Sequence, residues 1–323
     1  MINEITFEII QKCLNNCIYC SSNSNFYSSH IIEFNTFKKV LDEAVELGLK
    51  RLCVSGGEPF LHPEIIPMIQ YAKSKGIEVF VYSCGVVEYD SKVSSIPENI
   101  LQALSKIRLD KIIFNLPASN EILYSRITGT QNRFRLLKDS MHSAFNAGLY
   151  IEAHFVPMKI NIEDIESTIN FARKLNVKQV SFLRLVIQER AFKNREMLML
   201  SEPEEHELKN VLKSMQDCHN DIKIRIGIPF SKKHESRKCR AGLGKLIIRY
   251  DGAVLPCEAY KYIKCVNNGH EIKPDNINEH SLREIYFNSE FLNIFRQEIR
   301  AFQIENNSCE VCPAQARIKS LLG

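Results

Sequence analysis

Apolar, strand-like runs alternate with amphipathic helical stretches over the first 186 residues, and this alternation limits the fold more than any other feature. The runs expected as strands are Ile5–Ile10, Arg51–Val54, Glu78–Tyr82, Lys111–Leu116, Tyr150–Pro157 and Gln179–Val186. A repeated strand-then-helix order predicts parallel strands joined by right-handed crossovers. Six such units are too few to close an eight-unit barrel. The pattern therefore predicts an α/β fold, an open, partial (β/α)6 TIM-like barrel.

Helices are expected between these strands, and their ends carry capping signals. The expected spans are Asn35–Leu47, Glu64–Lys75, Glu98–Ile107, Arg133–Ala147 and Ile162–Leu175. Asn35 is interpreted as the cap of the first helix, because its side chain can accept a backbone hydrogen bond. Gly48, Gly76 and Gly148 stand where helices should end.

The alternation stops after Val186. The basic stretch Arg190–Arg195 is expected to be a loop, a helix capped by Ser201 follows it, and Ile222–Phe230 is expected to be a strand. A chain of 323 residues is long enough for one large domain and a small one. We therefore predict a barrel at residues 1–200, a connector at 201–235 and a small cysteine-rich domain at 236–323.

Composition argues against several classes of protein. The formal net charge of +4 is too small to indicate a nucleic-acid partner. No window approaches eighteen uninterrupted apolar residues, so no membrane partner is expected. The 11 cysteines follow no secretory signal, which argues against an exported disulfide protein. A cytoplasmic protein with metal-binding thiols is the expectation.

Cys13, Cys17 and Cys20 follow the first expected strand at the spacing C-x3-C-x2-C. A closed structural zinc site takes four nitrogen or sulfur ligands, and a cubane cluster has four irons to hold. Three thiolates on one short loop suit a four-iron cluster with one iron left open for a substrate or cofactor. By analogy with zinc enzymes, an open metal position indicates a catalytic site. A zinc knuckle is the alternative.

The segment Ser55-Gly56-Gly57-Glu58-Pro59 follows the second expected strand. Two glycines at a strand end allow a sharp turn and the close approach of a ligand to the backbone. An ordinary turn is the alternative. Taken together and in this order, the cysteine motif and the GGEP motif resemble those of the radical S-adenosylmethionine (radical SAM) enzymes. The resemblance implies the same partial (β/α)6 core.

The resemblance also implies a reaction and a set of site residues. In these enzymes a [4Fe–4S] cluster binds S-adenosylmethionine at its open iron, and reductive cleavage yields a 5′-deoxyadenosyl radical that abstracts a substrate hydrogen. It implies that Cys13, Cys17 and Cys20 are the cluster ligands. The residues implied at the cofactor are Gly56, Gly57 and Glu58 at its methionine end, Tyr19 near the adenine, and Ser83 after the third strand. A core aromatic is the alternative for Tyr19.

Three more residues lie on, or just after, strands expected to line the cavity. Asn115 on the fourth strand and Arg184 on the sixth are expected to contact the cofactor, and Arg184 suits a bidentate clamp of its carboxylate. A surface position is the alternative for Arg184. Cys84 stands near the barrel mouth, where catalytic groups gather. It is a candidate hydrogen-atom donor to a substrate radical, or alternatively an inert buried cysteine.

The C-terminal part begins with a hairpin signal. The run Lys245–Tyr250, then Asp251-Gly252, then Ala253–Pro256 predicts two strands joined by a tight turn. Cys239 precedes this hairpin and Cys257 ends it, so the two thiols are expected to converge.

Cys309 and Cys312 form a C-x2-C pair that brings this set to four thiolates, together with Cys239 and Cys257. The tail resembles the Twitch domain, the shorter form of the SPASM extension of radical SAM enzymes, which implies one auxiliary [4Fe–4S] cluster. A zinc ribbon is the alternative. Because no cysteine follows Cys312, a second auxiliary cluster is not expected. Cys265 is expected to be a buried small hydrophobe, and a substitute cluster ligand is the alternative.

Three functions compete for such a chain. The first is modification of a ribosomally made peptide by crosslinking, epimerisation or oxidation. The second is oxidation of a sugar, aminocyclitol or nucleotide, and the third is a metal-stabilised binding module. The first strand begins near residue 5, so no leader-binding domain is expected before it. A flavodoxin- or ferredoxin-type reductant is the expected electron donor.

Overall fold

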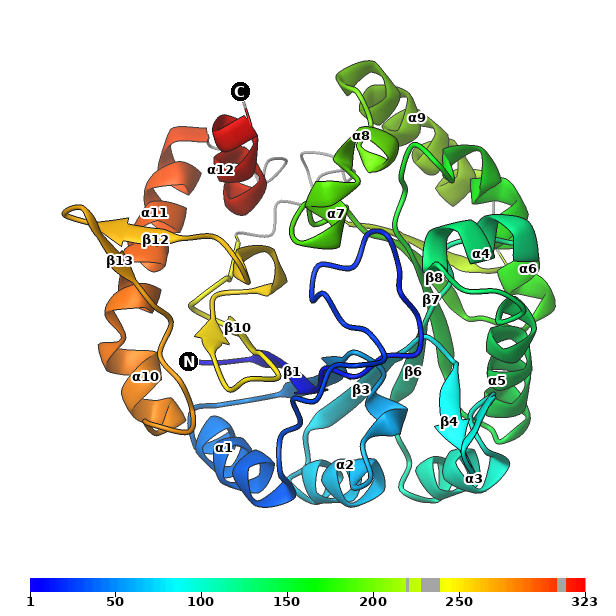
Figure 1. The fold of residues 1–323 in the computed structure, drawn as a ribbon, viewed down its shortest axis with the longest axis horizontal. Coiled ribbons are helices and arrows are strands. Elements are labelled where there is room, and N and C mark those ends of the chain that lie inside the picture. The colour runs from blue at the N-terminus through cyan, green and yellow to red at the C-terminus, as the bar shows by residue number, and fades with distance from the viewer. Residues whose placement is uncertain (219–220, 228–238, 307–311, 323) are drawn as a thin grey trace.

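The computed structural model describes every residue except 219–220, 228–238, 307–311 and 323 (Figure 1). Within this described part, the main sheet has nine strands in the order β11-β10-β1-β2-β3-β6-β7-β8-β9. The six predicted strands are β1 (Glu4–Ile10), β2 (Arg51–Gly56), β3 (Glu78–Ser83), β6 (Lys111–Asn115), β7 (Ile151–Phe155) and β8 (Gln179–Phe182). Each of them pairs in parallel with the next. The predicted α/β partial barrel is confirmed.

Three further strands extend this sheet at its two ends. β9 (Lys223–Ile226) pairs in parallel with β8, and β10 (Lys245–Ile248) pairs in parallel with β1. β11 (Val254–Leu255) is antiparallel to β10, which confirms the predicted hairpin. The hairpin therefore continues the barrel sheet instead of standing apart from it. The domain boundaries remain predictions.

Helices cover the outside of the curved sheet (Figure 1). Their bounds are α1 (Phe34–Glu46), α2 (Ile65–Ser74), α3 (Glu98–Lys106), α4 (Glu121–Thr128), α5 (Phe134–Asn146) and α6 (Ile165–Lys174). The predicted cap at Asn35 is wrong, because the helix already begins at Phe34 and Glu33 holds the extended cap position. Gly48, Gly76 and Gly148 have positive φ angles just after helices, as predicted.

The stretch predicted as a basic loop forms two short helices, α7 (Arg190–Lys193) and α8 (Arg195–Leu198). The prediction was wrong because Ala191, within this polar stretch, and Leu198, just after it, are fully buried and pack the two helices against the core. Ser201 caps α9 (Glu202–Cys218) as predicted: its hydroxyl oxygen accepts from the Glu204 N–H at 3.4 Å, and its own backbone N–H donates to the Glu204 carboxylate at 2.7 Å.

The remaining elements are small or belong to the C-terminal part. They are η1 (Pro59–Leu61), β4 (Val87–Tyr89), β5 (Lys92–Ser94), η2 (Ile162–Asp164), η4 (Glu258–Tyr260), β12 (Cys265–Asn267), β13 (His270–Ile272), α10 (Leu282–Asn288), α11 (Glu290–Asn306) and α12 (Pro313–Leu322). Among the described helices, none is both long and apolar enough to cross a membrane.

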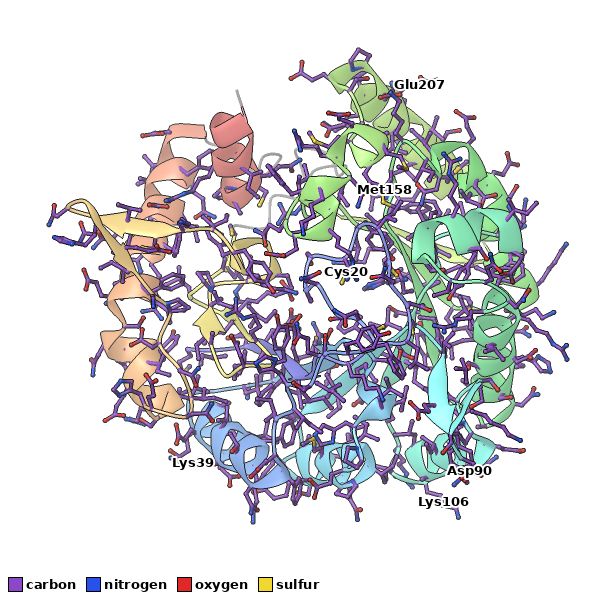
Figure 2. The ribbon with its side chains drawn as sticks, viewed as in Figure 1. Cys20, Lys39, Asp90, Lys106, Met158 and Glu207 are labelled. Atoms are coloured by element: carbon purple, nitrogen blue, oxygen red, sulfur yellow. The ribbon has the colours of Figure 1, made fainter. Side chains whose placement is uncertain are left out.

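The loop between β1 and α1 crosses the open centre of the ring of strands (Figure 1). Figure 2 shows Cys20 near this centre, whereas Lys39, Lys106 and Glu207 lie at the outer rim. Because this loop leaves the carboxyl end of β1, it lies at the face where barrel enzymes assemble their active sites. The fold thus brings the three-cysteine motif to the barrel mouth.

Candidate functional site

The cysteine loop, residues 11–33, carries Cys13, Cys17 and Cys20 within eight residues, and backbone hydrogen bonds hold this part of the loop. The Cys20 N–H donates to the Cys17 carbonyl at 3.2 Å, and the Cys13 N–H donates to Asn25 at 3.1 Å. Burial, followed by the neighbouring Cys13 and Cys20, raises the pKa of the Cys17 thiol. The structure therefore brings the three predicted ligands together.

The donor set of this loop fits an iron–sulfur cluster. Among the described residues, no three His, Cys, Asp or Glu side chains are placed to hold a single metal ion. A cubane makes no such demand, because each thiolate binds a different iron. Buried polar atoms nearly always have a hydrogen-bond partner, yet Asn15 Oδ1 and Ser24 Oγ in this loop have none among the described residues. These orphaned atoms suit a loop that folds around a bound polar group.

The GGEP turn packs directly on the start of the cysteine loop. The Gly57 N–H donates to the Ile10 carbonyl at 2.7 Å, and the Glu58 N–H donates to Lys12 at 2.9 Å. A Cβ added at Gly56 would lie 2.1 Å from the Ile10 oxygen, and one at Gly57 would lie 2.1 Å from the Lys12 oxygen. Both glycines are therefore required for contact between two backbones. That Gly56 and Gly57 also contact the cofactor remains a prediction.

Glu58 and Ser83, both predicted at the cofactor, are hydrogen-bonded to each other. The Ser83 hydroxyl donates to Glu58 Oε1 at 2.9 Å, and the Cys84 N–H donates to Oε2 at 2.7 Å. Burial raises the pKa of the fully buried Glu58. The carboxylate thus ties the end of β3 to the GGEP turn.

Cys84 packs beside Cys13 and Val86 in a small buried cluster. A hydrogen bond to Cys13 and burial both raise the pKa of its thiol. Cys84 is not among the described residues that line the cavity of the barrel interior. This placement favours the inert alternative, and a role as hydrogen-atom donor remains an untested prediction.

Tyr19 and Asn115 also meet, although they are 96 residues apart in the chain. The Tyr19 hydroxyl donates to Asn115 Oδ1 at 2.7 Å. Burial raises the pKa of Tyr19, so the phenol stays protonated near neutral pH. Two residues predicted at the cofactor from separate motifs thus lie side by side at the barrel mouth.

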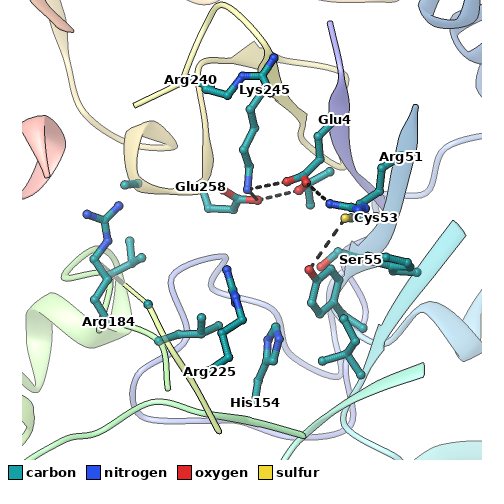
Figure 3. A pocket seen from close by; sticks show the side chains of 18 of the residues that line it. Glu4, Arg51, Cys53, Ser55, His154, Arg184, Arg225, Arg240, Lys245 and Glu258 are labelled. Atoms are coloured by element: carbon teal, nitrogen blue, oxygen red, sulfur yellow. Dashed lines mark hydrogen bonds and ion pairs between the residues drawn. The ribbon is translucent and has the colours of Figure 1, made fainter. Parts of the chain in front are cut away.

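A cavity of about 720 Å³ occupies the barrel interior (Figure 3). Ser55, at the start of the GGEP turn, lines it, as do Cys239 and Cys312 from the C-terminal part. In Figure 3, His154 and Arg225 point into it from one side, and Lys245 and Glu258 from the other. The cavity therefore extends from the GGEP turn to the auxiliary cysteines.

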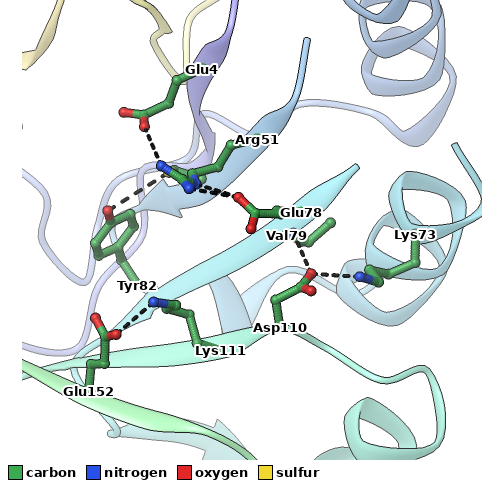
Figure 4. A network of polar contacts seen from close by, with 10 residues as sticks. Glu4, Arg51, Lys73, Glu78, Val79, Tyr82, Asp110, Lys111 and Glu152 are labelled. Carbon is green, nitrogen blue, oxygen red and sulfur yellow. Dashed lines mark hydrogen bonds and ion pairs between the residues drawn. The ribbon is translucent and has the colours of Figure 1, made fainter. Parts of the chain in front are cut away.

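Paired charges line part of this cavity. Lys245 lies 3.1 Å from both Glu4 and Glu258, and Arg51 lies 3.3 Å from Glu4. Lys111 pairs with Glu152 at 2.6 Å (Figure 4). Burial alone would raise the pKa of Glu258, but the charge of Lys245 and the hydrogen bond from Thr6 lower it to about 2. Glu258 therefore stays ionised, and each of the three glutamates has a lysine beside it.

His154, to which the sequence assigned no role, faces the same cavity. Burial, followed by the charges of Arg225 and Lys111, lowers its pKa to about 3. Its ring lies 5.2 Å from the ring of Tyr82. The cavity therefore contains a neutral imidazole at physiological pH.

The auxiliary cysteines surround the other end of the cavity. Cys239, Cys257 and Cys312 lie close enough to influence the same group, Arg184, whereas Cys309 lies outside the described residues. Burial raises the pKa of Cys257 to about 12. Three cysteines gathered at one place fit a metal cluster, which would bind them as thiolates and displace their protons.

Arg184 differs from its predicted position. β8 ends at Phe182, so Arg184 lies in the loop after the strand, because the chain leaves the sheet earlier than its apolar run indicates. Burial alone would lower its pKa, but the nearby Cys312 and Cys257 raise it. Arg184 thus lies beside the auxiliary thiols.

Arg190 is the main residue of the site that the sequence did not reveal. Its Nε donates to the Cys17 carbonyl at 2.8 Å, and its NH2 group donates to the Ser24 carbonyl at 2.7 Å. Asn194 donates to the Ile18 carbonyl at 3.0 Å. Helix α7 therefore holds the cysteine loop from one side. A basic run without a motif gave no signal for this role.

Comparison with known proteins agrees with this geometry. The family model described as Radical SAM superfamily matches residues 7–172, and that of an iron-sulfur cluster-binding domain (SPASM) matches residues 239–313. The PqqA peptide cyclase of Ruegeria pomeroyi is 24% identical over 293 residues, which cover 90% of this chain and 75% of the relative. The PqqA peptide cyclase of Gluconobacter oxydans is 23% identical over 292 residues, which cover 90% of this chain and 77% of that relative.

Solved structures share the fold. Streptococcus suis SuiB bound to S-adenosylmethionine superposes with a TM-score of 0.73 at 14% identity, over 92% of this chain and 68% of SuiB. The protein anSMEcpe with bound AdoMet superposes with a TM-score of 0.62 at 14% identity, and the match covers 90% of this chain and 83% of anSMEcpe. The Radical SAM match covers about half of the chain, from β1 to α6. The chain belongs to the radical SAM superfamily, and it is an enzyme of that family with an added iron–sulfur cluster-binding domain.

Proposed function

We propose that the chain modifies a ribosomally made peptide, by crosslinking, epimerisation or oxidation of a side chain or backbone carbon. The observation that carries the proposal is the cavity of about 720 Å³ between the GGEP turn and the auxiliary cysteines. This volume suits one or two side chains of a peptide. The similarity to two PqqA peptide cyclases over 90% of the chain supports a peptide substrate.

When bound, the first cluster and S-adenosylmethionine supply a 5′-deoxyadenosyl radical that removes a substrate hydrogen. The residues of the chain position the reacting groups. Glu58 fixes the GGEP turn through Ser83 and the Cys84 N–H, and Tyr19 and Asn115 order the barrel mouth at the neighbouring strand β6. His154 stays neutral in the cavity wall, where its ring nitrogens can exchange hydrogen bonds with a polar group of the substrate.

The cavity wall favours substrates with negative charge. Among the described lining residues, six are lysine or arginine and three are glutamate. All three glutamates are paired with lysine, and Arg225 and Arg240 have no carboxylate partner among the described residues. Because cations in a cavity of low dielectric attract anions strongly, an acidic peptide segment fits better than a basic one.

Two further parts of the proposal concern the setting of the reaction. We propose a flavodoxin- or ferredoxin-type protein as the electron donor, since the first cluster must be reduced by one electron in each turnover. We also propose a cytoplasmic location, which suits 11 cysteines kept as thiols and cluster ligands.

Co-expression tests the peptide substrate. The chain is produced with each short peptide encoded beside its gene, and the peptides are analysed by mass spectrometry. A loss of two hydrogens, or uptake of solvent deuterium at one carbon, supports the proposal if the Cys17→Ala variant gives neither. Unchanged peptides, together with 5′-deoxyadenosine release that responds only to sugars or nucleotides, would favour the small-molecule alternative.

A further inference from the structure

A buried lysine from the C-terminal part reaches the cysteine loop. Lys261 Nζ lies 2.6 Å from Glu8 Oε1 in β1 and 2.6 Å from the hydroxyl of Ser22, which is two residues after Cys20. The Ser22 hydroxyl in turn donates to the same Glu8 oxygen at 2.8 Å. The side chains of Lys261 and Glu8 are only 4% and 2% exposed.

Stability alone is a poor explanation for this ion pair. Taking two charges out of water is costly, and well-packed apolar side chains are often as stabilising as a buried pair. The pair is also incompletely bonded, because Glu8 Oε2 is buried without a partner among the described residues. Because burying Lys261 and Glu8 costs free energy, the charge of Lys261 suggests a role other than stability.

The surroundings of Lys261 show what that charge acts on. Burial alone would lower the pKa of Lys261, but its pairing with Glu8, and then the nearby Cys20, together raise it, so the ammonium stays protonated. Tyr250, also in the C-terminal part, donates to the Ser22 carbonyl at 3.4 Å. Arg190 holds the other side of the loop through Cys17 and Ser24. The loop is thus clamped between α7 and the C-terminal part.

We propose that Lys261 is a positioning residue for the first cluster. Through Ser22 it holds the Cys20 end of the loop in place, and it sets a positive charge beside a thiolate ligand. Outer contacts of this kind tune cluster reduction potentials, and a nearby cation favours the more negative, reduced state. The C-terminal part would therefore support the first cluster as well as the auxiliary one. This inference does not depend on the identity of the substrate.

The test uses the reconstituted full chain and the cluster whose EPR signal changes when S-adenosylmethionine is added. Lys261→Met is compared with Lys264→Met, a control whose side chain is 78% exposed. The double variant Glu8→Gln/Lys261→Met removes both charges and guards against misfolding caused by an unpaired Glu8. Lys261→Arg tests rescue by a retained charge. Iron content and reduction potential are measured for each protein.

We expect a lower reduction potential of the first cluster in Lys261→Met. The double variant should show a smaller shift in the same direction, because the lost Glu8 charge offsets part of the lost Lys261 charge. Lys261→Arg should lie closer to the wild type, and Lys264→Met should be unchanged. A Lys261→Met protein with the iron content and potential of the wild type would overturn the proposal, since the pair would then be only structural. A potential shift in Lys264→Met as large as that in Lys261→Met would overturn it too.

Discussion

Arg190 donates a hydrogen bond of 2.8 Å to the carbonyl oxygen of Cys17, across 173 residues of sequence. The same guanidinium reaches the Ser24 carbonyl, so one side chain spans the part of the loop that carries Cys17 and Cys20. The shape of the cysteine loop is therefore set by residues outside its motif.

Arg190→Met should weaken the cysteine loop. It removes charge-assisted hydrogen bonds to two backbone carbonyls, each worth about 1.5–3 kcal/mol. We expect a lower unfolding temperature and a smaller fraction of first-cluster iron after reconstitution. Arg195→Met is the control, because the Arg195 side chain donates to no described residue except the Phe192 carbonyl, three residues earlier. Equal iron content in the two variants would contradict the role of Arg190.

Gly57→Ala should disturb the contact between the GGEP turn and the cysteine loop. The new Cβ would meet the Lys12 oxygen at 2.1 Å, which backbone atoms must move to relieve. Overpacking of this kind costs about 1–3 kcal/mol or more. Gly148→Ala is the matched control: nothing lies within 4 Å, so it carries only the penalty of its positive φ. Denaturation should show the larger loss for Gly57→Ala, and iron analysis should show first-cluster loss in that variant alone.

His154 should make stability depend on pH. Its pKa is about 3 when folded, against an ordinary value of 6.5, so between these values the unfolded chain binds the extra proton. Stability therefore falls as the pH drops, by about 1.3 kcal/mol between pH 7 and pH 5.5. His154→Phe should lose this component, whereas a change at the exposed His142 should not. Anaerobic urea denaturation at the two pH values measures it, and identical pH dependence in His154→Phe and the wild type would refute it.

The auxiliary site should bind iron. The seven predicted ligand cysteines, three in the first motif and four in the C-terminal part, predict two four-iron clusters, or about eight irons per reconstituted chain, and Cys257→Ala should retain about four. The Cys13/Cys17/Cys20 triple alanine variant should also retain about four. Metal analysis with Mössbauer spectroscopy distinguishes the sites. Stoichiometric zinc in the triple variant would show a zinc ribbon instead.

Local signals in the sequence predicted a large share of the fold. Strand periodicity, the glycines after helices and the Asp251-Gly252 turn all act over a few neighbouring residues, and each gave the correct element. The three-cysteine motif also acts over a few neighbouring residues, and the structure brings Cys13, Cys17 and Cys20 together as the spacing predicts. Their role as cluster ligands remains a prediction.

Long-range partners were beyond such signals. Nothing near Lys261 in the sequence indicates Glu8, which lies 253 residues away. The pairing of β10 with β1 depends on which edge of the sheet is unpaired, and this cannot be predicted from the residues near β10 in the sequence. Arg184 was misplaced for a similar reason: the apolar run continues past Phe182, where the strand ends.

Release of 5′-deoxyadenosine by the reconstituted chain under a strong reductant tests the central claim most directly. The account predicts release by the wild type and by Cys265→Ala, a buried cysteine outside both predicted ligand sets, and none by Cys17→Ala. Undiminished release by Cys17→Ala, or no release by a wild type that holds its full iron, would contradict the account.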